Sequence, residues 1–238
     1  MSRSRKYAAE CLGTMILLAA VVGSGIMGER LSGGNVAIAL LANTMATGAT
    51  LIAIILALSS ISGAHLNPAV TLAVALQGGI NWVEVPGYVS AQVFGAFSGV
   101  AAAHVMFGEP IFAASLHARS GGAQVFSEFV ATFGLLSIIW GCSRVRAEAV
   151  PFAVGAYITG AYWFTASTSF ANPAVTLARS VTNTFSGIRP IDVPGFMAAQ
   201  IIGAVAATAL WAWLLPSLAR PTKEFVATTR ERIIVHEE

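Results

Sequence analysis

With 238 residues, 56% of them hydrophobic and only 10% charged, the chain is too apolar for a soluble domain of its length. A mean hydropathy of +0.74 indicates a polytopic membrane protein instead. The formal net charge of +2 says little by itself, and we expect no nucleic-acid partner. Two lone cysteines, Cys11 and Cys142, predict neither a disulfide framework nor a metal site.

Six apolar runs are long enough to cross a bilayer, whose hydrocarbon core is about 30 Å thick. In chain order they cover residues 7–27, 36–58, 85–107, 125–142, 150–167 and 193–215. With six spans and a cytoplasmic N-terminus, nine basic residues lie inside: Arg3, Arg5, Lys6, Arg144, Arg146, Arg220, Lys223, Arg230 and Arg232. Four lie outside: Arg30, Arg119, Arg179 and Arg189. The positive-inside rule therefore predicts that both termini are cytoplasmic.

Two nearly identical octapeptides stand between these runs. Residues 67–74 read NPAVTLAV and residues 172–179 read NPAVTLAR, so seven of eight positions agree. Each copy is typical of a helix start, because Asn caps free N–H groups and Pro is favoured at the first helical position. Gly78 and Gly187 end these helices after roughly 8 residues, or about 12 Å, which is too short to cross a membrane.

The two halves of the chain, 7–107 and 125–215, repeat one pattern. Ala9-Glu10 in the first is matched by Ser127-Glu128 in the second, and residues 85–88 (VPGY) by 193–196 (VPGF). Three crossings per half place the second repeat upside down relative to the first. The two short helices then enter from opposite faces, and their N-termini meet near the midplane as a broken seventh span. Interrupted segments at matching places indicate a permeation site.

Three ionisable residues in or near the apolar runs need an explanation. Glu10 and Glu128 lie within spans, where carboxylates are costly and by default functional. As proton relays they would indicate a coupled transporter. His65, two residues before Asn67, is a candidate for the cytoplasmic half of a pore, and it has no second ligand at metal-binding spacing.

These motifs resemble the aquaporin and aquaglyceroporin family over residues 7–215. The resemblance rests on two Asn-Pro-Ala boxes, the context SGAHLNPAVT at 62–71, and a Glu-x-x-x-Thr pattern in each half. It implies six tilted helices and two half-helices around one pore per subunit, and a homotetramer. Glu10 and Glu128 would brace the half-helix loops. The boxes would form the centre of the pore: Asn67, Pro68, Ala69, Asn172, Pro173 and Ala174.

Helix N-termini meeting at this centre would present about one unit of positive charge, which repels cations and protons. Members of the family usually carry Arg directly after the second box, where this chain has Val175. Counting from the boxes, the resemblance assigns the outer constriction to Thr47, Gly160, Ser169 and Val175. Since all four are small or apolar, we expect a wide constriction that loses size selectivity more fully than ion exclusion.

Arg179 stands four residues beyond Val175, one helical turn further toward the outer mouth. It would act either as a displaced gate charge or as a tie for the connecting loop, and the loop role is favoured. His117 and Arg119 precede the second repeat and are expected in a solvated loop.

The sequence thus predicts an all-α membrane protein with six transmembrane helices plus two half-helices in two inverted repeats. One channel domain would cover 1–221, followed by a cytoplasmic tail at 222–238. Thr47, Gly160 and Val175 most resemble the divergent bacterial members of arsenic-resistance operons. That resemblance implies a passive channel in the bacterial inner membrane for water, glycerol-like polyols, arsenite, methylarsenicals and other neutral metalloids, without a cofactor.

Other functions stay open beside this one. A water-selective pore, a proton-coupled transporter using Glu10 or Glu128, and a closed-pore structural member are the alternatives. An intramembrane hydrolase would need a nucleophile and a base, for which Ser24 and His104 offer the parts without a joining motif. The prediction for this chain is therefore that it is not an enzyme.

Overall fold

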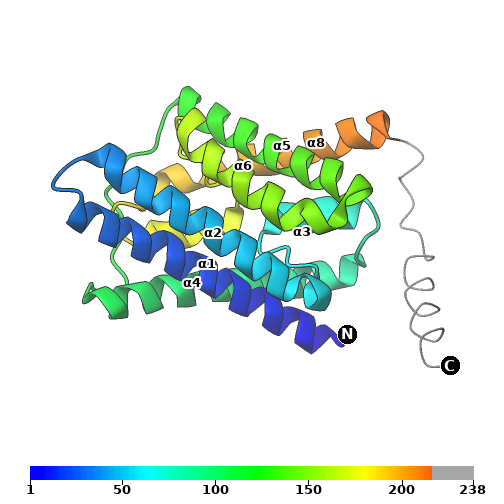
Figure 1. The fold of residues 1–238 in the computed structure, drawn as a ribbon, viewed down its shortest axis with the longest axis horizontal. Coiled ribbons are helices and arrows are strands. Elements are labelled where there is room, and N and C mark those ends of the chain that lie inside the picture. Colours follow the sequence, from blue (N-terminus) through cyan, green and yellow to red (C-terminus); the bar gives the residue numbers. More distant parts are fainter. Residues whose placement is uncertain (216–238) are drawn as a thin grey trace.

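The computed structural model describes residues 1–215. The expected tail at 222–238 lies outside these residues. Within them the chain is helical, with no strand. Figure 1 shows the helices side by side along one long axis: α1 (Arg3–Leu31), α2 (Val36–Ser62), α3 (Pro68–Leu76), α4 (Val85–Phe107), α5 (Gly122–Val145), α6 (Val150–Phe164), α7 (Pro173–Ala178) and α8 (Val193–Leu214).

The order of long and short helices is the predicted one, but α6 is shorter than expected. It has 15 residues and ends at Phe164, whereas the apolar run continues to residue 167. The other five long helices have the length and hydropathy needed to cross a membrane. The predicted end of this span at residue 167 is three residues too late, because the helix gives way after Phe164 to a loop in which Thr168, Ser169 and Ala171 adopt left-handed backbone angles.

Equivalent helices of the two halves make equivalent packing contacts. α1 lies against α4 in the first half and α5 against α8 in the second, while α2 and α6 join the halves. Gly95 of α4 and Gly203 of α8 allow the close approach, since a β-carbon there would collide with the carbonyl oxygens of Cys11 and Phe129. The repeat seen in sequence is therefore also a repeat in packing.

The two half-helices enter from opposite ends of the bundle. Gln77, just after α3, donates to the Thr208 carbonyl near the end of α8 and accepts from Arg144 near the end of α5. The turn after α7 instead pairs with the α4–α5 connection, where the Ala113 amide donates to the Val181 carbonyl. Figure 1 places the N-terminus and the end of α8 at the same end of the bundle.

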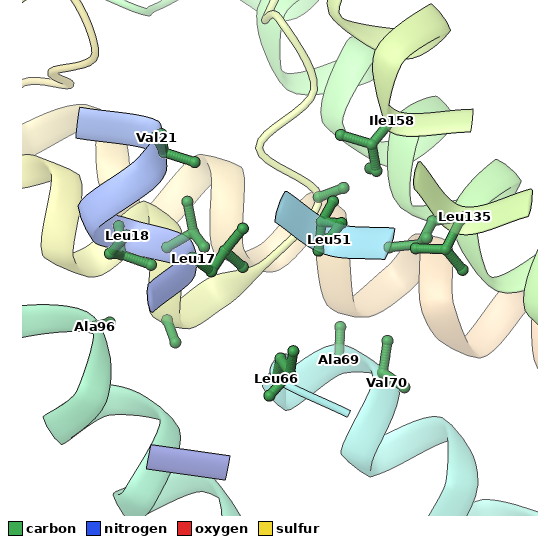
Figure 2. Packing of buried hydrophobic residues seen from close by; sticks show 14 of the residues in the cluster. Leu17, Leu18, Val21, Leu51, Leu66, Ala69, Val70, Ala96, Leu135 and Ile158 are labelled. Atoms are coloured by element: carbon green, nitrogen blue, oxygen red, sulfur yellow. The ribbon is translucent and has the colours of Figure 1, made fainter. Parts of the chain in front are cut away.

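Apolar residues fill the interior and also cover the outside. Figure 2 shows Leu17, Leu51, Val70, Leu135 and Ile158 converging from five different helices. Large exposed hydrophobic side chains cover the periphery: Phe94, Phe126, Phe152, Trp163, Ile202 and Trp213. Such an apolar outer surface is suited to contact with lipid.

Candidate functional site

Asn67 and Asn172 join the two half-helices at their N-termini. The Asn67 side-chain nitrogen donates to the Ala171 carbonyl at 2.7 Å, and that of Asn172 donates to the Leu66 carbonyl at 2.8 Å. Each side-chain oxygen caps its own helix by accepting from the amide of Ala69 or Ala174. Pro68 and Pro173 occupy the first helical position. The predicted helix starts are thus confirmed, and the broken span is linked by reciprocal hydrogen bonds.

Glu10 holds the loop that leads into α3. Its Oε1 accepts from the Ser62 hydroxyl at 2.6 Å and from the His65 amide at 2.9 Å. Its Oε2 accepts from the Leu66 amide at 2.6 Å and from the Gln92 side chain at 2.8 Å. All of these donors point at one carboxylate, which therefore fixes the loop before Asn67.

Glu128 makes the equivalent contacts before α7. Its two oxygens accept from the amides of Phe170 and Ala171, both at 2.9 Å. Gln200 donates to Glu128 at 2.6 Å and to Thr176 at 2.8 Å, as Gln92 does to Glu10 and Thr71 in the first half. Both carboxylates are fully buried, and neither lines the central cavity. This position favours a bracing role over a proton relay.

The bracing carboxylates offset a strained backbone. Leu66 has a φ of 52° and Ala171 a φ of 49°, in the left-handed region that costs a residue with a β-carbon about 1–2 kcal/mol. Each is the residue directly before a box asparagine, and its amide donates to Glu10 or Glu128. The strain turns the carbonyls of Leu66 and Ala171 toward the opposing asparagine.

A cavity of about 250 Å³ runs past both asparagines. Most of its wall is aliphatic, including Leu17, Val21, Leu51, Ile55, Val70, Val74, Leu135, Val154, Ile158 and Val175. Polar groups are few: Thr47, His65, Asn67, Ser143, Tyr162, Ser169, Asn172 and Arg179. Among the described residues, Arg179 is the one lining residue with a permanent charge. The other box residues, Pro68, Ala69, Pro173 and Ala174, are buried behind the wall.

Three of the four expected constriction residues line this cavity, and Gly160 does not. Thr47, Ser169 and Val175 are buried on its wall. Gly160 is exposed, and it shares the outer face of α6 with Phe152 and Ala156. The prediction for Gly160 is wrong. It counts twelve residues back from Asn172, and that fixed offset ignores the left-handed backbone at residues 168, 169 and 171 between α6 and α7.

Tyr162 lies on the cavity wall from α6 instead. Together with Val154 and Ile158 it follows the spacing of one helical face. Its hydroxyl lies 3.4 Å from that of Thr47, to which it donates. The expected constriction of small or apolar residues alone is therefore corrected, because the aromatic residue Tyr162 also lies on the cavity wall.

Arg179 lies on the wall near Phe170, beyond Val175. Its Nε donates to the Ser186 carbonyl, and its guanidinium carbon lies 3.4 Å from the centre of the Phe170 ring. Arg119 covers the ring as well, at 4.9 Å, and donates to the Gly187 and Ser167 carbonyls. The expectation of a solvated loop holds for exposed His117 but is wrong for Arg119.

The opposite end of the cavity carries a different ring at the equivalent position. His65, like Phe170, stands two residues before its asparagine. Its ring lies 5.0 Å from that of Tyr88, and Phe170 lies 5.4 Å from Phe196. The Nδ1 of His65 lies 3.1 Å from the Thr71 hydroxyl. This internal match is the signal by which sequence reasoning could have found Phe170.

Neither a metal centre nor a catalytic pair is visible in the described part of the chain. Residues 1–215 hold no group of three or more His, Cys, Asp or Glu side chains suited to a metal ion. Ser24 donates to the Ala20 carbonyl and accepts from Asn43, whereas His104 contacts Pro110, Ile111 and Thr182. The two parts of the hydrolase alternative thus belong to different hydrogen-bond networks.

Sequence comparisons connect this geometry to known proteins. The family described as major intrinsic protein matches residues 1–158 and 142–235. Aquaglyceroporin AqpS of Rhizobium meliloti (strain 1021) is 56% identical, over 92% of this chain and 93% of its own length. Aquaporin NIP1-3 of Oryza sativa subsp. japonica is 32% identical, over 94% of this chain and 78% of its own.

A structural comparison supports the fold. The X-ray structure of the aquaglyceroporin from Plasmodium falciparum superimposes with a TM-score of 0.71, covering 92% of this chain and 99% of that one, at 21% identity. The predicted fold class, six long helices plus two half-helices in an aquaporin-like arrangement, is confirmed.

Proposed function

The chain belongs to the major intrinsic protein family, and we propose that it is a passive channel for small uncharged solutes. The observation that carries this proposal is the cavity at the junction of the two half-helices, with its mostly aliphatic wall. Such a wall cannot replace the hydration shell of an ion, whereas a neutral solute needs only a few hydrogen bonds. Solutes would move down their gradients without a cofactor.

The solutes we propose are hydroxylated and uncharged, namely water, glycerol-like polyols, arsenous acid and methylated arsenicals. Val175 widens the outer part of the cavity relative to an arginine there, while Thr47, Tyr162 and Ser169 offer hydroxyl groups. Cys11 and Cys142 do not line the cavity, so trivalent arsenic would meet no thiol. Similarity to an aquaglyceroporin supports the same class.

The channel is proposed to lie in the bacterial inner membrane as a homotetramer, with one domain over 1–221 and both termini cytoplasmic. Arg3 and Lys6 pair with Glu84, just before α4, and Arg144 lies near the end of α5. These basic groups gather at the end of the bundle where the chain starts (Figure 1), which supports a cytoplasmic location for that end.

Stopped-flow light scattering on proteoliposomes tests this function with water, glycerol and arsenous acid. We expect the native channel to pass all three, and Val175→Arg to reduce glycerol and arsenous acid permeation at least about tenfold while water changes less than about threefold. The matched control is Val83→Arg, because Val83 is exposed and outside the cavity. This control should behave like the native protein.

Two results would overturn the proposal. A native protein that passes only water is a water-selective pore. Flux that follows an imposed pH gradient and collapses with an uncoupler indicates a proton-coupled transporter.

A further inference from the structure

The two half-helix octapeptides differ at a single position, which is Val74 in the first and Arg179 in the second. Both residues line the cavity. Because the half-helices enter from opposite ends, these residues stand at opposite ends of the wall. The chain therefore places a cation at the outer end of an otherwise duplicated element, and an aliphatic side chain at the other.

Arg179 is buried without a countercharge. Only 2% of the residue is exposed. Within residues 1–215, no carboxylate lies within 4.0 Å of its guanidinium, since the ion pairs there involve Arg3, Lys6, Arg30 and Arg189. Glu128, behind Phe170, is occupied by two backbone amides and Gln200. A buried, unpaired cation in a membrane protein is costly and indicates a functional role.

The guanidinium is clamped by a hydrogen bond and by an aromatic ring, and part of its hydrogen-bonding capacity is unused. Its Nε is fixed by the Ser186 carbonyl and its plane lies over Phe170. Ser186 is itself anchored, because its hydroxyl donates to the Val21 carbonyl at 2.9 Å. In contrast, Nη1 of Arg179 has no hydrogen-bond partner among the described residues, and neither has the hydroxyl of Ser169 on the same wall.

We propose that Arg179 is the specificity-determining residue of the outer pore: its clamped guanidinium supplies the positive charge that excludes cations while neutral solutes pass. This inference rests on the proposed function. In this arrangement, different residues set the width of the pore and its charge. Val175 leaves the pore wide, while the cation of Arg179 stands one helical turn further out. A unit charge about 5 Å away at an effective dielectric of 20 lowers cation occupancy about two hundredfold.

Urea and guanidinium provide a matched pair of probes, because they are both planar and similar in size but differ in charge. We would measure the uptake of radiolabelled urea and of radiolabelled guanidinium into proteoliposomes under a fixed membrane potential. The ratio of the guanidinium permeability to the urea permeability does not depend on the amount of folded protein. We expect the native channel to pass urea and exclude guanidinium. Arg179→Gln should raise guanidinium permeation relative to urea at least about tenfold.

Two further variants separate charge from structure. Arg179→Lys keeps the charge, and we expect its ratio to stay within about threefold of native. Arg189→Gln removes another basic group of the outer segment. Because Arg189 pairs with Asp192 and does not line the cavity, this variant should leave the permeability ratio unchanged.

Each outcome decides between the roles. An unchanged ratio in Arg179→Gln, with urea permeation intact, overturns the inference. Loss of urea permeation in both Arg179→Gln and Arg179→Lys also overturns it, because the residue is then only a tie for the loop. A native protein that passes neither urea nor glycerol contradicts the proposed function itself.

Discussion

The two half-helix regions share a scaffold but differ in the side chains that face the cavity. Both have a capping asparagine, a bracing carboxylate and a ring two residues before the asparagine. The first region combines a polar ring, His65, with aliphatic Val74. The second combines an apolar ring, Phe170, with cationic Arg179. The two repeats thus share the same supports, while the side chains that face the cavity differ in polarity and charge.

The two half-helices also differ in length. α3 runs for nine residues and ends before Gly78, whose φ of 75° suits a helix end. α7 has only six residues and passes into a 3₁₀ turn at Arg179–Val181. That turn lets the Arg179 side chain reach the Ser186 carbonyl, while the Ile188 amide donates to the Arg179 carbonyl. Two helices of nearly identical sequence therefore end differently because the loops after them differ.

The largest expected effect comes from removing either brace. Glu10→Gln and Glu128→Gln each place an amide nitrogen where backbone N–H groups point, so a buried donor loses its acceptor. We expect each to lower the free energy of unfolding by about 3 kcal/mol, with Glu10→Gln the more severe, since Glu10 accepts from four donors and Glu128 from three. Thermal unfolding in detergent measures both.

Glu148→Gln serves as the control for the braces, because Glu148 is exposed in the turn before α6. Its melting temperature should match that of the native protein. If only one of the two brace variants were destabilised, the two scaffolds would not be equivalent.

A smaller effect is expected from giving the first region the side chain of the second. Val74→Arg places a cation on the cavity wall of the first region, where the histidine ring of His65 stands in the place of Phe170. We expect urea and glycerol permeation to fall about tenfold, because the added charge has to be hydrated within the cavity. Val74→Met adds length without charge and should reduce permeation less than about threefold. Equal losses in both variants would mean that bulk alone matters.

Local patterns in the sequence predicted the supports of the pore. The repeated octapeptide, with its Asn cap and its Pro at the first helical position, predicts both half-helices correctly. Three crossings per repeat predict that they enter from opposite ends, as the contacts of Gln77 and Val181 indicate. These features depend on helix capping and on the odd number of crossings in each repeat, and both are visible in the sequence alone.

Long-range geometry was not readable in this way. Counting back from Asn172 assigned Gly160 to the constriction, because the left-handed turn between α6 and α7 is invisible to a fixed offset; Tyr162 takes the place on the wall. The packing of half-buried Arg119 against Phe170 depends on two distant loops that pair in space. Such contacts follow from packing and leave no local pattern.

The smallest expected effect compares the acidic residues just before α4 and α8, Glu84 and Asp192, which occupy equivalent places in the two halves. The pKa of Asp192 is lowered because its carboxylate accepts from Arg189 and from the Arg119 amide. Because the pKa is lower in the folded state, the carboxylate stabilises the protein at pH values above its unfolded pKa of about 3.9, and this stabilisation is lost as the pH falls through the folded pKa.

Asp192→Asn should thus cost about 1 kcal/mol or less at pH 7. Its melting temperature should converge with the native one toward about pH 3. Glu84→Gln, which removes the contacts with Arg3 and Lys6, is the matched variant at the other end. A gap between Asp192→Asn and native protein that persists unchanged at low pH would show that the asparagine disturbs the loop itself rather than removing an ion pair.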